Sequence, residues 1–257
     1  MESINICYWG SNGNWGDEVN KIICAKISGK AVNKISTEEE AATFRYYCIG
    51  SILQSAKSNN FEVWGTGLMH SNGRLPYAPN KIHAVRGPLT RDLLLKQGFD
   101  CPEIYGDPAL LYPRFYKPNI KKKYRFGIIP HYADFSDPWV QKFSNNPDVK
   151  IINIKDRTCN KFIDDIHECE ILLSSSLHGI IAGDAYGIPS YWIELSNKVH
   201  GKGFKFNDYF LSVKRPLVEP IRPKLETNIK DFSNTFYNYK IDIDLDLLYN
   251  ACPFKQS

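Results

Sequence analysis

The sequence predicts an α/β protein with two Rossmann-like domains that face each other across a cleft. Short apolar runs alternate with segments of helical periodicity, which is typical of a parallel sheet covered by helices. The alternation stops at residues 112–124, which hold two prolines and three consecutive lysines, and then resumes. We therefore expect an N-terminal domain over residues 1–112, a C-terminal domain over 124–215, and an extension over 216–257 that can pack back on the N-terminal domain.

Each element has its own signal in the chain. Apolar runs predict strands at residues 4–9, 46–50, 62–65, 81–85, 103–105, 125–130, 149–154, 171–174 and 190–195. Periodicity and capping residues predict helices at 16–27, 88–97, 160–169, 177–186 and 242–252. The carboxyl ends of parallel strands are where such folds form sites, so the turns that follow the strands are the candidates.

Composition excludes several classes of function. The net charge is +4, and without a basic stripe along the chain we expect no nucleic-acid binding. Six basic residues between Arg114 and Arg125 form either a solvated linker or a patch for phosphate-bearing or membrane-surface partners. The seven cysteines form no CxxC pair, and we expect no metal and no cofactor. No signal peptide or membrane span is visible, so we expect a cytoplasmic protein, with peripheral contact at the inner face of a membrane left open.

The turn after residues 171–174 carries the strongest functional signal. Three serines, Ser174 to Ser176, lead into the helix over 177–186, and His178 lies in its first turn. The first turn of a helix presents free N–H groups and a positive dipole end, which favour an anion. We expect this turn to bind an anionic small molecule.

Five other turns, and the strand end at Glu194, hold candidate residues whose roles the sequence leaves open. Asp17 either complements a helix dipole or acts as an acid or base in the cleft. Arg86 either grips a carboxylate or phosphate with its forked guanidinium or forms a salt bridge to Asp107 or Asp92. Asp107 is a cap, a partner of Arg86 or a catalytic carboxylate. His70, His131 and Glu194 follow strands, as does Gly67, and each is either a cleft residue or structural.

Taken in order, these turns resemble the polysaccharide pyruvyl transferase family. The matching segments are Asn14-Trp-Gly-Asp-Glu18, Gly65-Thr-Gly67, Val85-Arg-Gly-Pro-Leu-Thr-Arg91, Gly106-Asp-Pro-Ala-Leu110, Ser174-Ser-Ser-Leu-His-Gly179 and Ala185-Tyr-Gly-Ile-Pro189. The resemblance implies a glycosyltransferase-B-like fold. It also implies transfer of pyruvate from phosphoenolpyruvate to sugar hydroxyls, forming a cyclic ketal on a capsule or exopolysaccharide or on its lipid-linked precursor, such as an undecaprenyl-diphosphate-linked sugar.

The resemblance also assigns roles to residues. His178 is the expected proton donor and Asp17 the base or acceptor-orienting group. The expected donor-binding residues, most of them in the C-terminal domain, are Arg86, Ser174, Ser175, Ser176, Leu177, Gly179 and His131. The expected acceptor or cleft residues are Asn14, Gly67, His70, Asp107 and Glu194. One departure matters: many family members carry arginine at the position of Ser176, so another cation must substitute for it here.

Two other classes of function remain open from the sequence. A nucleotide-sugar-dependent glycosyltransferase of the same fold would use the basic turn of the second domain to hold a diphosphate. A non-catalytic sugar-binding relative would have lost its donor site, and Ser176 is the feature that points to it.

Overall fold

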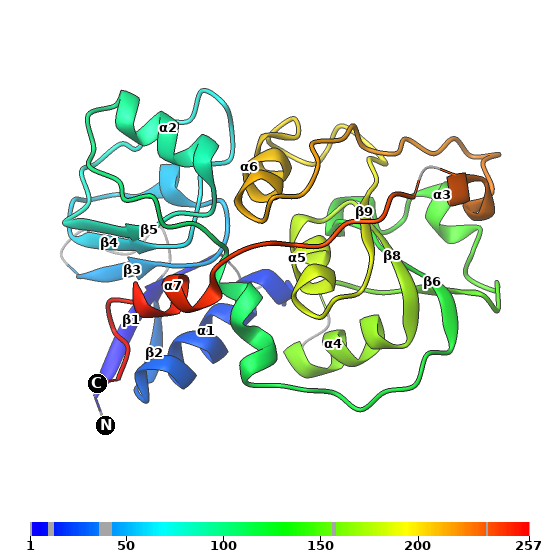
Figure 1. Cartoon of the computed structure of the whole chain (residues 1–257), viewed down its shortest axis with the longest axis horizontal. Helices are drawn as coiled ribbons and strands as arrows, with labels where there is room; N and C mark the ends of the chain where they lie inside the picture. The colour runs from blue at the N-terminus through cyan, green and yellow to red at the C-terminus, as the bar shows by residue number, and fades with distance from the viewer. Residues whose placement is uncertain (1, 10–12, 36–42, 156–157, 235, 257) are drawn as a thin grey trace.

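The computed structural model describes residues 2–9, 13–35, 43–155, 158–234 and 236–256, and these form two parallel sheets side by side (Figure 1). The first sheet has the strand order β2-β1-β3-β4-β5. Its strands are β1 (Ser3–Cys7), β2 (Ala31–Ile35), β3 (Arg45–Tyr47), β4 (Phe61–Trp64) and β5 (Lys81–Ala84). Because the order reverses between β1 and β3, the loops after these two strands diverge and leave a crevice at the carboxyl edge.

The second sheet repeats this arrangement with the order β7-β6-β8-β9. Its strands are β6 (Tyr124–Ile129), β7 (Val149–Ile151), β8 (Cys169–Ser174) and β9 (Ser190–Trp192). All pairings are parallel, and the order reverses between β6 and β8. The second sheet therefore has its own crevice at the carboxyl ends of β6 and β8.

The helices lie beside and between the sheets (Figure 1). They are α1 (Trp15–Ser28), α2 (Pro88–Lys96), α3 (Pro138–Gln141), α4 (Cys159–His167), α5 (Leu177–Ala185), α6 (Phe204–Ser212) and α7 (Leu245–Asn250). Short 3-10 turns are η1 (Leu53–Ser55), η2 (Pro108–Arg114), η3 (Tyr132–Asp134) and η4 (Ile229–Asn234). Helix α1 shows why they form: Val19, Ile23 and Ile27 recur every fourth residue and are buried, and Gly29 ends the helix with a φ of 64°.

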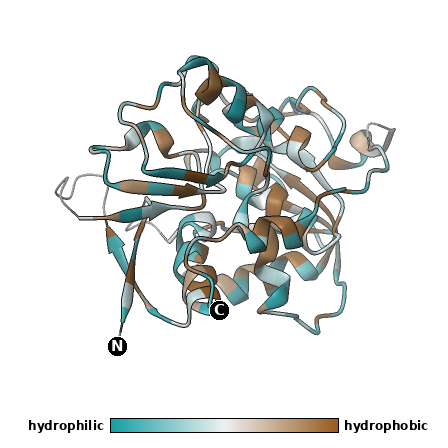
Figure 2. Ribbon diagram, turned by 60° about the vertical axis from the view of Figure 1, so that its left-hand side comes forward, coloured by the Kyte–Doolittle hydropathy of each residue, from teal (hydrophilic) through white to brown (hydrophobic). Residues whose placement is uncertain are grey.

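The two halves share buried contacts. The indole of Trp15 packs against Tyr112 and Phe162, with ring centroids 5.8 and 5.3 Å away, and its backbone N–H donates to the carbonyl of Ile154 at 2.9 Å. One hydrophobic cluster continues from Ile4 in the first sheet to the helices of the second. In Figure 2, hydrophobic residues gather where helices and sheets meet. These contacts join the two sheets and their helices through buried surface.

The C-terminal extension crosses from the second domain to the first (Figure 1). Ile221 bridges Ile193 at the edge of the second sheet. Farther along, the carbonyl of Leu248 accepts a hydrogen bond from Trp64 Nε1 at 2.9 Å, and the Phe254 ring packs on Trp64 with centroids 5.6 Å apart. The extension therefore ties both domains together.

The α/β prediction with two Rossmann-like sheets is confirmed, and eight of the nine predicted strands overlap observed ones. The strand predicted at 103–105 is wrong: Tyr105 forms one isolated bridge with Val85, and Gly106 turns the chain with a φ of 133°. Strand β2 and helices α3 and α6 were not predicted.

Candidate active site

A cavity of about 400 Å³ lies where the crevices of the two sheets meet. Its lining comes from loops that follow β1, β3 and β4 in the first domain and β6, β8 and β9 in the second. The lining residues are Trp9, Asn14, Asp17, Gly50, Ser51, Ile52, Gln54, Met69, His70, His131, Tyr132, Ser176, Leu177, His178, His200 and Lys205. Both topological switch points therefore open into one shared space.

Lys205 brings a buried positive charge to this cavity. The side chain belongs to α6 and is 8% exposed. Burial, and then the charge of Arg86, lowers the pKa of Lys205 to about 8. Among the described residues, no salt bridge or hydrogen bond joins its ammonium to a carboxylate. A buried cation without a carboxylate partner favours an anionic ligand.

The pKa of His131 is also affected by the positive charge in this cavity. Burial lowers the pKa of His131 to about 4, and positive charge from Lys205, His200, Lys155 and His178 adds to the effect. Its Nδ1 accepts a hydrogen bond from the backbone N–H of Ala133 at 3.3 Å, so the neutral ring carries its proton on Nε2. The cavity is therefore a site of positive potential in which His131 stays uncharged near neutral pH.

The three serines before α5 have different tasks. Ser174 Oγ lies 2.9 Å from the carbonyl of Ile129 and accepts from Ser176 N–H at 3.0 Å. Ser175 Oγ accepts from His131 N–H at 2.8 Å. Ser176 is the N-cap residue of α5, its side chain makes no capping hydrogen bond, and it lines the cavity. Two of the serines thus hold the turn in shape, and the third presents a hydroxyl at the positive end of α5.

His178 and Asp107 form an incomplete pair across the two domains. His178 Nε2 lies 3.8 Å from Asp107 Oδ2, and both atoms are buried without a hydrogen-bond partner among the described residues. The other oxygen of Asp107 caps η2 by accepting from Ala109 N–H at 2.9 Å. A Cβ on Gly16 would lie 1.8 Å from His178 Nδ1, so the ring packs directly against the start of α1. Glycine at position 16 leaves the space that the imidazole occupies.

Asp17 lies in the first turn of α1 and lines the same cavity. Burial raises the pKa of Asp17 to about 6, and positive charge on His178 opposes the shift. A carboxyl group with a pKa near 6 can exchange a proton close to neutral pH, which suits an acid or base. Asp17 and His178, predicted from separate turns, are therefore brought together.

Arg86 lies behind the cavity wall in this structure, because its side chain is fully buried. The guanidinium contacts Asp208 of α6 with Nη2 at 2.9 Å and donates to the carbonyl of Leu68 at 2.7 Å and to Ser51 Oγ. The salt bridge expected at this position exists, but its partner is Asp208 rather than Asp107 or Asp92. Donor contact by Arg86 stays a prediction.

The remaining sequence-predicted residues divide into lining and supporting groups. Asn14, His70 and Leu177 line the cavity. Gly67 and Gly179 make room for neighbours, since a Cβ would lie 2.6 Å from Arg86 Cζ or 2.3 Å from Ser174 Oγ, respectively. Glu194 does not line the cavity, and pairs with Arg222 instead. Gly10 to Asn12 of the first turn lie outside the described residues.

Sequence reasoning missed Lys205, His200 and Asp208 because it placed no helix between residue 195 and the helix predicted over 242–252. A signal was present: Phe206, Tyr209, Phe210 and Val213 recur at helical spacing and are buried. Lysine is usually a surface residue, so nothing local marks Lys205 as buried. Its role depends on how α6 packs against the first domain.

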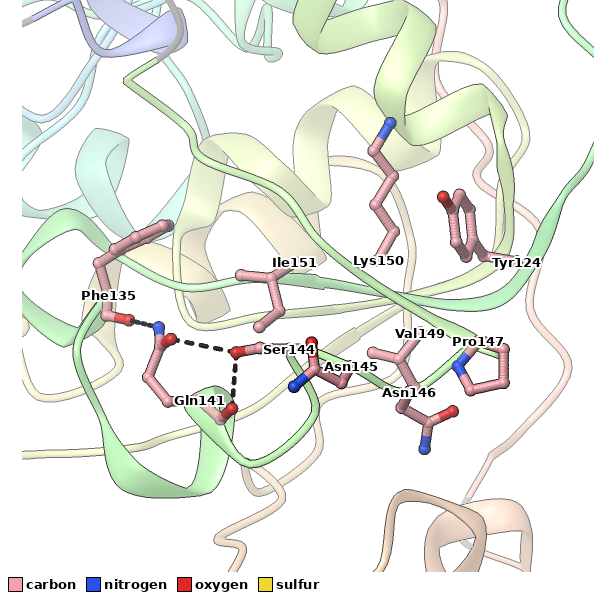
Figure 3. A pocket seen from close by; sticks show the side chains of 10 residues that line it. All are labelled: Tyr124, Phe135, Gln141, Ser144, Asn145, Asn146, Pro147, Val149, Lys150 and Ile151. Carbon is pink, nitrogen blue, oxygen red and sulfur yellow. Dashed lines mark hydrogen bonds between the residues drawn. The ribbon is translucent and has the colours of Figure 1, made fainter.

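A second hollow, of about 550 Å³, lies beside β7 (Figure 3). Two of its polar side chains are already paired: Gln141 donates to the carbonyl of Phe135, and Ser144 donates to the carbonyl of Gln141. Its one lysine, Lys150, is neutralised by Asp165 and Glu168. This hollow therefore offers no free charge for a ligand.

Two features are absent from the described part of the chain. No group of three or more His, Cys, Asp or Glu side chains there is placed to hold a metal ion. Within the same residues, none of the helices combines the length and the apolar character needed to cross a bilayer.

Comparison with known proteins points to one family. Residues 77–197 match the family model described as polysaccharide pyruvyl transferase. An uncharacterized protein of Acanthamoeba polyphaga mimivirus is 30% identical over 97% of this chain and 88% of its own length. The succinoglycan biosynthesis protein ExoV of Rhizobium meliloti (strain 1021) is 26% identical over 87% of this chain and 70% of its own length.

Proposed function

Because the chain belongs to the polysaccharide pyruvyl transferase family, we propose that it moves pyruvate from phosphoenolpyruvate to two hydroxyls of a sugar, forming a cyclic ketal. The observation that carries this proposal is the shared cavity, in which a buried cation, the start of α5 and a histidine converge. The acceptor is a sugar of a cell-surface polysaccharide or of its lipid-linked precursor. We infer from the two crevices that the domains work in a glycosyltransferase-B-like manner.

Lys205 and the start of α5 bind the donor in this proposal. Phosphoenolpyruvate has a carboxylate and a phosphate, so it needs positive charge that is not already neutralised. Lys205 supplies it, and thereby replaces the arginine that many family members carry at the position of Ser176. The free N–H groups at the start of α5 and the Ser176 hydroxyl add hydrogen bonds to the second anionic group.

His178 and Asp17 move the protons. His178 protonates the methylene carbon of phosphoenolpyruvate, and the central carbon becomes electrophilic and takes the oxygen of one sugar hydroxyl. Asp17 accepts the proton of that hydroxyl. The bond to phosphate then breaks, and the second hydroxyl attacks the same carbon to close the ketal. Overall, one hydroxyl proton ends on the new methyl group and the other on inorganic phosphate. Asp107 steadies the charged imidazole across the domain boundary.

Isothermal titration of the purified protein with phosphoenolpyruvate tests the donor. We expect one site in the wild type and at least about tenfold weaker binding in Lys205→Met, because an ion pair within the cavity is lost. Lys198→Met, which removes an exposed lysine of the preceding loop, should bind like the wild type. Tight binding of a uridine or guanosine diphosphate sugar with no binding of phosphoenolpyruvate would favour the glycosyltransferase alternative instead.

A further inference from the structure

The mouth of the cavity differs from its floor. Among the described residues, the exposed aromatic side chains are Trp9, Tyr77 and Tyr132, and two of these three line this one cavity. Lys205 and Ser176, in contrast, are 8% and 3% exposed. The cavity therefore has a polar, buried floor and an aromatic rim. Exposed aromatic rings gathered at a cavity indicate a binding surface rather than a core.

Trp9 has the more open ring of the two. It follows β1 and is 57% exposed, whereas the other tryptophans of the chain, Trp15, Trp64, Trp139 and Trp192, are all buried. Within the described part of the chain, no aromatic ring or cation stacks on its indole. Leaving an indole in water forgoes the free energy of burying it, so a ligand that covers this ring gains that energy on binding.

Tyr132 contributes to the rim from the loop that follows β6. The His131 ring packs on it with centroids 4.1 Å apart, and Lys155 Nζ lies 4.5 Å from its ring centroid. Its ring is therefore already covered in part, so less of its face is free to stack on a ligand than is the case for Trp9. Lys155 keeps this side of the rim positive.

We propose that Trp9 is the platform on which a pyranose ring of the acceptor stacks, with its hydroxyls directed toward Asp17 and His178. This inference rests on the proposed function. A pyranose presents C–H groups on its faces and hydroxyls at its edge. The face of an indole carries negative charge density, so it attracts such C–H groups while both apolar surfaces leave water. The hydroxyls at the edge then meet Asn14 and Gln54, which line the same cavity. Their side-chain oxygens already accept from the backbone N–H groups of Gly16 and Met69, so it is their NH2 groups that can donate to the sugar.

In this proposal the two substrates occupy different depths of the cavity, with the donor below the acceptor. The anionic donor reaches Lys205 at the floor, and the sugar then covers it at the rim. The remainder of a glycan or lipid-linked acceptor extends outward past Tyr132 and Lys155. The acceptor class is thus a pyranose with two free hydroxyls near one another, recognised by its apolar face.

Tryptophan fluorescence gives a direct test, since Trp9 is the exposed tryptophan. The probes are methyl β-D-galactopyranoside, methyl β-D-glucopyranoside and methyl β-D-mannopyranoside, each titrated with phosphoenolpyruvate present. At least one should protect Trp9 from acrylamide quenching. Calorimetry should show its affinity about tenfold weaker in Trp9→Ala. Tyr77→Ala, which removes an exposed tyrosine away from the cavity, should leave the sugar affinity unchanged.

The readouts separate this inference from the function on which it rests. Phosphoenolpyruvate alone should bind Trp9→Ala and the wild type equally. If phosphoenolpyruvate does not bind the wild type, the proposed donor is wrong, and the proposed role of Trp9 is not what has failed. Protection by none of the three pyranosides, or unchanged sugar affinity in Trp9→Ala, would overturn the platform. So would protection by uridine diphosphate alone, because a base would then be the stacking partner.

Discussion

Two acid–base pairs lie between the domains, and they differ in how many of their polar atoms form hydrogen bonds. Arg86 and Asp208 approach to 2.9 Å and are both fully buried. Asp208 also accepts from the Thr90 N–H and hydroxyl at 2.8 and 2.7 Å, so the second domain caps α2, whose own N-cap residue is Gly87. His178 and Asp107, in contrast, are 3.8 Å apart, and within the described part of the chain His178 Nε2 and Asp107 Oδ2 are buried without hydrogen-bond partners.

The difference assigns separate tasks to the two pairs. A buried pair with full hydrogen bonding rigidifies the structure, and removing one partner strands the other charge. Unpaired buried polar atoms cost stability, and such costs are concentrated where function requires them. We therefore propose that the Arg86–Asp208 pair stabilises the contact between the domains and that the His178–Asp107 pair acts in catalysis.

The largest effect expected is on turnover in His178→Gln. Loss of a positioned general acid typically costs about 100- to 10,000-fold, so pyruvate incorporation from phosphoenolpyruvate should fall by at least about two decades. Thermal unfolding should change little, because Nε2 makes no hydrogen bond in the wild type. Turnover near the wild-type rate would mean that the proton comes from elsewhere, with His70 and His131 as the next candidates.

The second-largest effect is on stability in Asp208→Asn. Loss of one charge from a buried pair costs about 3–5 kcal/mol, since Arg86 is left uncompensated. Urea unfolding monitored by circular dichroism measures the change. The control is Asp242→Asn, which breaks the exposed pair with Lys214 and should leave the free energy of unfolding close to that of the wild type, because solvent screens the pair. Equal costs in the two variants would show that burial of the Arg86 pair has no consequence.

A smaller effect on turnover is expected in Asp107→Asn. The amide can still cap η2 through its oxygen, so stability should hold, but the charge that steadies the imidazolium is lost. The maximal rate should fall by about 10- to 100-fold while the KM for phosphoenolpyruvate stays constant. Asp137→Asn is the matched control, because Asp137 caps α3 in the same way, by accepting from Trp139 N–H at 2.9 Å. A change in KM alone would assign Asp107 to donor binding.

The smallest and most graded effect is the pH dependence of kcat/KM. Asp17 must be deprotonated to act as a base, and its raised pKa of about 6 predicts that activity falls as pH drops below 6. Lys205 must be protonated to hold the donor, and its lowered pKa of about 8 predicts a fall above 8. Lys205→Arg should move the alkaline limb upward, because a guanidinium stays charged. If the alkaline limb stays in place in Lys205→Arg, the group that titrates there is not Lys205.

The sequence predicted the parts of the site that are local in the chain. The turn at 174–179, the placement of Asp17 at the start of α1 and the strands before them follow from apolar runs and capping residues. The burial of Lys205 and the pairing of Arg86 with Asp208 do not, because they depend on contacts between elements about 120 residues apart. Likewise, no residue of β2 is buried and the strand has no continuous apolar run, so no pattern revealed it.

The measurement that tests this account most directly compares Asp107→Asn and Asp208→Asn side by side for the free energy of unfolding and for turnover per folded molecule. We expect each variant to lose a different property: one its stability, the other its turnover. Asp208→Asn should lose about 3–5 kcal/mol of stability while its folded fraction stays active, and Asp107→Asn should keep its stability while turnover falls about 10- to 100-fold. Parallel losses of stability and turnover in both variants would contradict the separation of tasks between the two pairs.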